Sequence, residues 1–165
     1  MRIIGGKLKG KSISFLKSPI TRPLKDSVKE SIFNIIAHSN ILNINLEKSN
    51  ILDLYSGIGS FGLECISRGA EKVFFVEKNN EAAQVLSKNS FDLSVQNKAT
   101  IVVDEIKNFL VKAQKIKFEI VFFDPPFKDN NYINELKLIN EKKIYKKNNL
   151  VIIHRERKSS DDFKK

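Results

Sequence analysis

Short apolar runs alternate with amphipathic stretches along the chain from residue 50 onward. The apolar runs predict strands at 51–55, 73–77, 100–103, 119–123 and 149–154. The amphipathic stretches predict helices near 60–68, 80–90, 105–114 and 131–140. A run such as Val73-Phe74-Phe75-Val76 is typical of a strand buried on both faces. Strands and helices that alternate with short connections predict an α/β fold with a mostly parallel sheet covered by helices.

The first 49 residues have a different pattern. Apolar and basic side chains alternate over residues 2–17 around Gly5-Gly6 and Gly10, which predicts a short hairpin with a lysine-rich face. Thr21-Arg22-Pro23 indicates a turn. We therefore divide the chain into an N-terminal extension, residues 1–49, and a main domain, residues 50–165.

A helix is predicted after this turn. Ser27 and Glu30 have the spacing of a capping box, and the helix should end near His38. Its expected apolar stripe consists of Leu24, Val28, Ile32, Ile35 and Ile36. Residues 39–49, rich in Asn and Ser, are expected to link the helix to the main domain.

The net charge of +10 is unevenly distributed. Residues 1–29 hold eight basic residues and one acidic residue, residues 30–127 are close to neutral, and the tail from 128 to 165 is again basic. Two basic segments around a near-neutral body favour a polyanionic partner. We expect the N-terminal segment to bind nucleic acid, whereas the tail lysines fit a solvated surface equally well. The candidate RNA-binding residues are Arg2, Lys7, Lys9, Lys11 and Arg22.

Several classes of protein are not expected. The single cysteine, Cys65, has no disulfide partner and is read as core packing. No apolar run approaches the roughly 20 residues that span a membrane, and no secretion signal is seen, so we expect a cytoplasmic protein. No Cys or His cluster has metal-ligand spacing, so no metal is expected. Neither His38 nor His154 is assigned a catalytic role, because a partly buried histidine at the end of a helix or strand is the commoner case.

Three glycines follow the first apolar strand of the main domain. Gly57, Gly59 and Gly62 stand where a turn into a helix lets backbone N–H groups approach a ligand closely. This spacing predicts a site for a nucleotide-like cofactor, although it also fits the dinucleotide sites of dehydrogenases.

Carboxylates at three successive strand ends sharpen this prediction. Asp53 is placed to order the glycine loop or to compensate the positive charge of a sulfonium ligand. Glu77 lies 20 residues after Gly57, where a carboxylate accepts hydrogen bonds from two ribose hydroxyls, and its charge argues against NADP. Asp104 is expected to face the base of the same cofactor, with a helix N-cap as the alternative or additional role.

Asp124-Pro125-Pro126-Phe127 closes the strand at 119–123. An exocyclic amine on a nucleobase is a poor nucleophile because its lone pair is delocalised into the ring. A carboxylate from Asp124 and the carbonyl of Pro125 are placed to accept its two N–H bonds, and Phe127 is placed to stack on the ring. Asp-Pro and Pro-Pro are also ordinary turn signals, but in combination with the glycine loop they indicate methyl transfer to an amine.

With these motifs in place, the chain resembles the RsmD family of S-adenosylmethionine-dependent 16S ribosomal RNA guanine-N2 methyltransferases. The opening, residues 1–10, is similar to that family's hairpin. Thr21 to Asn34 is similar to its characteristic helix, and the cofactor and amine motifs follow in the family's order.

The resemblance implies a Rossmann-like class I methyltransferase sheet, S-adenosylmethionine as cofactor, and 16S ribosomal RNA as partner, either naked or in an assembled small subunit. We expect a monomer that does not bind membranes. Phe127 stands where the family usually has tyrosine. The family also continues beyond residue 154 through a helix into an antiparallel hairpin, so we expect the last strands to be missing here.

Two other functions fit parts of the pattern. A DNA adenine or cytosine amino-methyltransferase shares the Asp-Pro-Pro-aromatic motif but normally has a larger target-recognition domain. A non-catalytic RNA-binding protein on a truncated methyltransferase fold is the second. An NAD-binding oxidoreductase leaves the amine motif unexplained.

Overall fold

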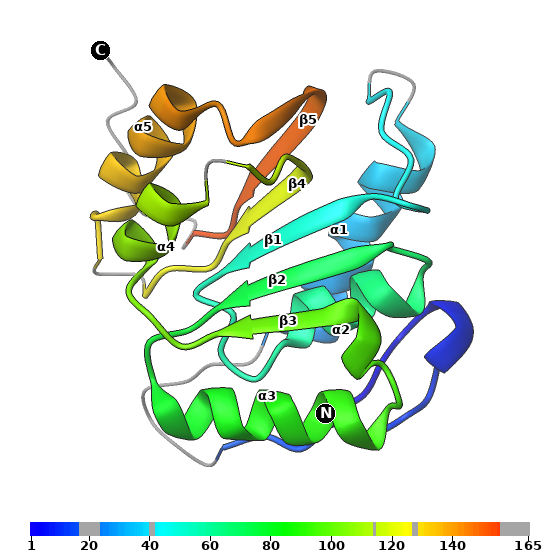
Figure 1. The fold of residues 1–165 in the computed structure, drawn as a ribbon. Helices are drawn as coiled ribbons and strands as arrows, with labels where there is room; N and C mark the ends of the chain where they lie inside the picture. The colour runs from blue at the N-terminus through cyan, green and yellow to red at the C-terminus, as the bar shows by residue number, and fades with distance from the viewer. Residues whose placement is uncertain (17–23, 40–41, 114, 127–128, 156–165) are drawn as a thin grey trace.

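The computed structural model describes residues 1–16, 24–39, 42–113, 115–126 and 129–155. Its centre is one five-stranded sheet with the order β3-β2-β1-β4-β5 (Figure 1), and every pair of neighbouring strands is parallel. The strands are β1 (Asn50–Leu54), β2 (Lys72–Val76), β3 (Ala99–Val102), β4 (Phe118–Phe123) and β5 (Tyr145–Ile153). The predicted parallel sheet is confirmed, with each strand overlapping its predicted range.

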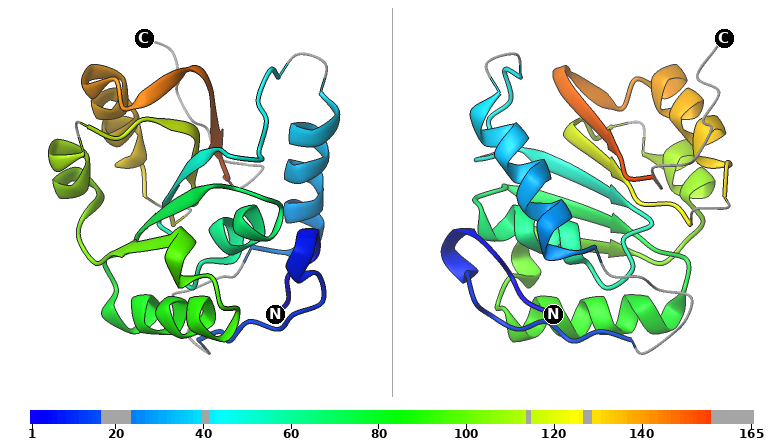
Figure 2. Two further views of the ribbon diagram at one scale, coloured as in Figure 1. Left: turned by 45° about the vertical axis from the view of Figure 1, so that its right-hand side comes forward. Right: turned by 180° about the vertical axis from the view of Figure 1, so that it is seen from behind.

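Helices cover both faces of this sheet (Figure 2). One face carries α1 (Asp26–His38), α2 (Ser60–Ser67) and α3 (Asn80–Asp92), and the other carries α4 (Ile106–Lys112) and α5 (Tyr132–Lys142). Successive strand residues point to opposite faces, so Ile51 packs in the core beneath α1–α3 while Leu52 packs in the core beneath α4 and α5. Cys65 is fully buried in the first of these cores, as its sequence context predicts.

A stack of three phenylalanine rings joins α1 to the sheet. The ring centroids of Phe33 and Phe61 are 5.5 Å apart, and those of Phe61 and Phe122 are 3.9 Å apart. Such stacked pairs add about 0.5–1.5 kcal/mol each beyond the burial of their area. The N-terminal helix is therefore anchored through α2 to β4, the strand that leads into the Asp-Pro-Pro motif.

The N-terminal segment is less regular than a hairpin. Within residues 1–16, an antiparallel bridge joins Arg2 to Ser12 around a short 3-10 helix at Gly6–Leu8, and no longer strand pairing is present. This segment is docked on α2, because the Ile4 N–H donates to Glu64 Oε2 at 2.9 Å and the Leu8 N–H donates to Ser67 Oγ at 2.9 Å.

Helix α1 differs from its prediction in two details. It begins at Asp26 after Lys25, and no side chain caps it, so the predicted capping box from Ser27 to Glu30 is wrong. Its apolar stripe is also shifted, because Ile35 is 59% exposed while Phe33 is buried.

Lys29 shares the buried face of α1 with Phe33 and Ile36 and is itself fully buried. Its ammonium group donates to the carbonyl oxygen of Arg2 at 2.9 Å and pairs with Asp26 at 3.2 Å, and the fully buried Glu64 lies 3.9 Å away. Long charged side chains become buried only when such partners are present. Lys29 therefore belongs to the interior and not to the basic surface.

Strand β5 starts four residues earlier than predicted. Phe118 pairs with Tyr145 and Ile120 with Leu150, so extra residues bulge out of β5 between these two pairs. The bulge has the polar sequence Lys146-Lys147-Asn148-Asn149, which carries no apolar strand signal. Residues 156–165 lie outside the described residues, so the expectation of missing C-terminal strands stays a prediction.

Candidate functional site

The chain turns sharply as it leaves β1. Tyr55 has a positive φ of 57°, which is uncommon for a bulky residue and is typical of constrained functional loops. Its hydroxyl donates to Glu135 Oε2 of α5 at 2.7 Å, and burial together with this hydrogen bond raises the pKa of the hydroxyl. The turn thus sends the ring toward α5 and leaves residues 56–59 to form the glycine loop.

Two glycines allow the loop to pass into α2. Gly59 caps the helix with φ at 85°, a conformation that side chains rarely adopt. A Cβ at Gly62 would lie 2.2 Å from Cε1 of the buried Phe75 ring. The third glycine of the motif is therefore required because α2 packs directly on β2.

Glu77, at the end of β2, ties the loop to the neighbouring strand. Its Oε2 accepts the Gly57 N–H at 2.8 Å, and its Oε1 accepts the Asn79 N–H at 2.8 Å. A carboxylate has about four lone-pair sites, so each oxygen keeps acceptor capacity for a further donor. Glu77 is thus fixed in position without being saturated.

Asp53 is buried within β1, where its Oδ2 accepts the Gly62 N–H at 2.9 Å. Burial raises the pKa of this carboxyl well above its ordinary value, the hydrogen bond from Gly62 lowers it, and the charges of Asp124 and Glu77 raise it further. Asp53 therefore holds the first turn of α2, which fits the loop-ordering role predicted for it. Asp53 thus lies within electrostatic reach of both Glu77 and Asp124.

Asp104 lies two residues beyond the end of β3, against the start of α4. Its Oδ1 accepts hydrogen bonds from the Glu105 N–H and from the side-chain amide of Asn108, each at 2.8 Å, and Lys112 reaches its Oδ2 at 3.2 Å. The Asn108 hydrogen bond, followed by that of Lys112, lowers the pKa of Asp104. The N-cap residue of α4 is Glu105, so the alternative of Asp104 as the N-cap is wrong.

The glycine loop has two features that fit a bound cofactor. Ser56 is 8% exposed, and its Oγ has no hydrogen-bond partner among the described residues. A Cβ built on Gly57 meets nothing within 4 Å, so open space lies beside this turn. A buried hydroxyl without a partner next to open space, beside the carboxylate of Glu77, is suited to a polar ligand such as a nucleoside.

Asp124 stands at the point where the strand order reverses, since β1 pairs with β2 on one side and with β4 on the other. Ligands of open parallel sheets bind at such a point, beyond the carboxyl ends of the strands. The Asp124 N–H reaches the Leu54 carbonyl at 3.4 Å, which places the Asp-Pro-Pro segment beside the glycine loop. Pro125 is buried, Pro126 is exposed, and Phe127 lies outside the described residues.

His154 is a partner of Asp124 that sequence reasoning missed. Its Nδ1 lies 2.7 Å from Asp124 Oδ1, and this hydrogen bond raises the pKa of the imidazole from its ordinary value of 6.5. The two residues are neighbours because β4 and β5 pair Phe123 with Ile153, and the next pair in register is Asp124 with His154. The sequence places each residue just after a predicted strand, which is a signal that they could be neighbours. The bulge in β5 concealed the register between β4 and β5 that brings them together.

Arg155 holds the segment that follows the prolines. Its guanidinium donates to the carbonyl oxygens of Pro126 at 3.1 Å and Asp129 at 3.2 Å, and to Asn130 Oδ1 at 3.2 Å. It also lies 4.8 Å from the ring centroid of Tyr132. His154 thus contacts the side chain of Asp124, and Arg155 contacts the main chain of Pro126.

The candidate RNA-binding residues differ in whether they are paired with an acidic side chain. Lys7, Lys9 and Lys11 are exposed on the N-terminal segment. Arg2 is exposed as well, but its guanidinium lies 3.5 Å from Asp26. Arg22 lies outside the described residues.

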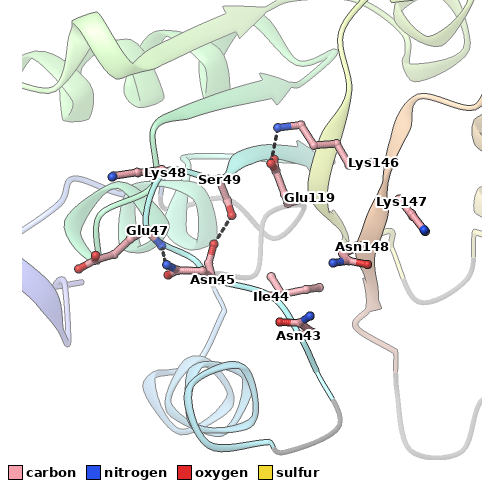
Figure 3. A pocket seen from close by; sticks show the side chains of 10 residues that line it. All are labelled: Asn43, Ile44, Asn45, Glu47, Lys48, Ser49, Glu119, Lys146, Lys147 and Asn148. Atoms are coloured by element: carbon pink, nitrogen blue, oxygen red, sulfur yellow. Dashed lines mark hydrogen bonds and ion pairs between the residues drawn. The ribbon is translucent and has the colours of Figure 1, made fainter.

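A pocket of about 440 Å³ lies away from this site (Figure 3). It is formed near the amino-terminal ends of β1 and β4 and contains none of the predicted site residues. Among its lining residues, Lys146 is ion-paired with Glu119, and Ser49 donates a hydrogen bond to the carbonyl of Asn45. Within the described ranges, no three His, Cys, Asp or Glu side chains are grouped to hold a metal, and no helix is long and apolar enough to cross a membrane.

Comparison with known proteins agrees with this arrangement. Ribosomal RNA small subunit methyltransferase D of Haemophilus influenzae is 33% identical over 159 residues, which cover 95% of this chain and 79% of the relative. The protein of the same name from Buchnera aphidicola of Acyrthosiphon pisum is 31% identical over 158 residues, covering 96% and 79%. The solved structure of yhhF from Escherichia coli superposes with a TM-score of 0.82 at 28% identity, covering 97% of this chain and 84% of that chain.

The family model described as Conserved hypothetical protein 95 matches residues 1–164, nearly the whole chain. The predicted class I methyltransferase fold is confirmed by these neighbours. The chain therefore belongs to the RsmD family of methyltransferases.

Proposed function

We propose that this protein transfers a methyl group from S-adenosylmethionine to the exocyclic N2 amine of a guanine in 16S ribosomal RNA. The observation that carries the proposal is the meeting of two motifs at the switch point of the sheet. A glycine loop fixed by Glu77 lies on one side, and Asp124 lies on the other. The names of the relatives, which are small-subunit rRNA methyltransferases, support the same substrate class.

The cofactor half of the site would be formed by the loop after β1. Glu77 keeps acceptor capacity for the two ribose hydroxyls, and the unpartnered Ser56 hydroxyl and the open space at Gly57 fit a ligand beside it. Asp53 adds a negative charge beneath a sulfonium, and Asp104 is proposed to face the base. When bound, the cofactor supplies an electrophilic methyl group on a positively charged sulfur.

The amine half would be formed by the segment after β4. The carboxylate of Asp124 and the carbonyl of Pro125 would accept the two amine N–H bonds and so turn the nitrogen lone pair toward the methyl group. As transfer moves positive charge from sulfur to nitrogen, a nearby carboxylate stabilises the transition state. Pro126 would keep the loop rigid, and the ring of Phe127 would stack on the guanine.

Contact with RNA is assigned to the basic N-terminal segment, residues 1–29. Lys7, Lys9 and Lys11 are exposed there and form no ion pair with an acidic side chain among the described residues, so they can bind phosphates. Arg2 and Arg22 are proposed as further contacts. We propose that the protein acts as a monomer in the cytoplasm, on rRNA that is either free or assembled into a small subunit.

The two alternatives are less well supported. A DNA amino-methyltransferase would use the same Asp124 geometry, but its relatives would not be expected among rRNA methyltransferases. A non-catalytic RNA-binding protein would have no need to keep Glu77 and Asp124 in place. Both carboxylates are held by hydrogen bonds in this structure.

Substitution of Asp124 tests the proposal. Asp124→Ala should abolish methylation of small-subunit particles by labelled S-adenosylmethionine, because the amine loses its acceptor. The affinity for the cofactor, measured by calorimetry, should remain nearly unchanged. Glu119→Ala, which removes a carboxylate at the opposite end of the same strand, is the matched control and should retain activity. Full turnover by Asp124→Ala would refute the proposed amine site.

A further inference from the structure

The contact between Asp124 and His154 is built by the sheet itself. The His154 N–H donates to the Phe123 carbonyl at 2.8 Å, so β4 and β5 remain paired up to the point where both side chains leave the sheet. The side chains of Asp124 and His154 are 24% and 26% exposed, so their 2.7 Å contact is partly shielded from solvent. A hydrogen bond to a charged group is stronger there than on an open surface.

The contact also divides the two oxygens of Asp124 between different tasks. Oδ1 is engaged by His154 Nδ1, whereas Oδ2 accepts no hydrogen bond from the described residues. A carboxylate that is held on one oxygen loses its rotational freedom, and its second oxygen is then preorganised for another donor.

We propose that His154 is a positioning residue for methyl transfer, in that its neutral imidazole donates Nδ1–H to Asp124 Oδ1 and presents Oδ2 to the substrate amine. An imidazolium at the same place switches transfer off. This inference rests on the proposed function of Asp124 and adds to it a residue that sets both the geometry and the pH response.

The charge balance of the reaction gives the sign of this switch. The N–CH3 bond forms as the S–CH3 bond breaks, the electron pair of the broken bond stays on sulfur, and the amine becomes positively charged before it releases one proton to solvent. An imidazolium 2.7 Å from Asp124 neutralises the carboxylate that should stabilise this charge. Neutral His154 leaves that negative charge intact.

Among the described residues, Asp53 and Arg155 bring further charge near the pair. Asp53 in β1 is electrostatically coupled to Asp124, and the Arg155 guanidinium is occupied by the carbonyl oxygens of Pro126 and Asp129. Hydrogen bonding to Asp124 is the largest influence on the imidazole and raises its pKa above 6.5, while burial opposes it. The change of protonation therefore occurs on the alkaline side of that value.

Two substitutions separate the donor from the titration. His154→Asn retains an N–H donor near the place of Nδ1 and does not titrate, whereas His154→Phe retains the ring volume without a donor. The rate of a single turnover is measured with labelled S-adenosylmethionine and small-subunit particles, between about pH 5.5 and about pH 9, where an imidazole titrates. Binding of S-adenosylhomocysteine is measured in parallel.

The wild-type rate should rise with pH with a midpoint above 6.5. His154→Asn should lose this acid limb and approach the wild-type plateau. His154→Phe should also lose the acid limb, but its rate should stay at least about tenfold below the wild-type plateau at every pH, with unchanged cofactor affinity. A wild-type rate and acid limb in His154→Phe would overturn the inference while leaving the proposed function standing. Failure of the wild-type protein to methylate any particle would overturn both.

A second readout needs no activity. The chain has two histidines, His38 and His154, so an NMR titration shows two imidazole signals, and a His38→Gln variant assigns them. The pKa of His154 should lie above 6.5 and should fall in Asp124→Asn, because the carboxylate charge is removed. An unchanged pKa in Asp124→Asn would contradict the pair on which the inference depends.

Discussion

Removal of the Glu77 side chain should weaken both the fold and the cofactor site, by amounts that can be estimated from its two hydrogen bonds. In the ligand-free protein, Glu77→Ala leaves the N–H groups of Gly57 and Asn79 without their acceptor. Hydrogen bonds to a charged group contribute about 1.5–3 kcal/mol, and partial exposure reduces each here to about 1 kcal/mol. The loss of unfolding free energy should therefore be about 2 kcal/mol, or about 4–8 °C in Tm for a chain of this size.

The same substitution removes the proposed acceptor of the ribose hydroxyls. We expect binding of S-adenosylhomocysteine to weaken by about 1–3 kcal/mol, which corresponds to roughly 5- to 150-fold in Kd. Calorimetric titration at a temperature well below the Tm measures this change on folded protein. Glu77→Gln should be intermediate in stability, because one amide oxygen can accept only one of the two backbone N–H groups.

Glu81→Ala is the matched control, since it removes an exposed carboxylate four residues along, in the first turn of α3. It should change neither Kd nor Tm beyond a few tenths of a kcal/mol. A Glu77→Ala protein that is less stable but binds the cofactor with wild-type affinity would show that Glu77 only orders the loop. In that case the ribose assignment is wrong.

Three further substitutions test other parts of the site. Asp53→Asn keeps an oxygen for the Gly62 N–H but removes a buried charge, so the stability of the ligand-free protein near pH 7 should be retained or rise. The variant should lose more affinity for S-adenosylmethionine than for S-adenosylhomocysteine, whose sulfur is uncharged. Equal losses of affinity by calorimetry would limit Asp53 to loop ordering. Gly62→Ala should lower the unfolding free energy by about 1–3 kcal/mol in urea denaturation because its Cβ meets the Phe75 ring, and wild-type stability would contradict this packing. Joint replacement of Lys7, Lys9 and Lys11 by Ala should weaken RNA binding and flatten its log–log salt dependence by about two to three units, whereas cofactor affinity stays constant. The matched control replaces three exposed lysines on or near α4 and α5 by Ala: Lys107, Lys115 and Lys137. An unchanged salt slope in the N-terminal variant would contradict the assignment of RNA binding to this segment.

The parts of the fold that could be predicted are those that depend on residues close together in the sequence. Continuous apolar runs marked the buried strands, and the glycines after β1 marked the loop because their backbone conformation and close packing exclude other residues. Glu77 and Asp124 followed from the rule that strand ends meet at one edge of a parallel sheet, and Asp53 followed from its place in β1 just before the glycine loop.

The parts that were missed depend on partners distant in sequence. Lys29 was included among the basic surface residues because its buried neighbours cannot be identified from the sequence around it. These neighbours are Glu64, 35 residues further along the chain, and the carbonyl of Arg2. The start of β5 was hidden by its polar bulge, and with it the register that brings His154 to Asp124. A single sequence indicates where each strand ends, but it does not show which residue of the neighbouring strand is paired with that end.

Identification of the methylated base tests the central claim most directly. The wild-type protein is incubated with labelled S-adenosylmethionine and separated ribosomal particles, and the labelled nucleoside is released by nuclease digestion and identified by mass spectrometry. We predict that the label enters 16S rRNA as a guanosine methylated at N2 and that Asp124→Ala leaves the same particles unlabelled. Label on a ring nitrogen or a ribose hydroxyl, or in DNA instead of RNA, would contradict the account of a carboxylate and a proline carbonyl that orient an exocyclic guanine amine.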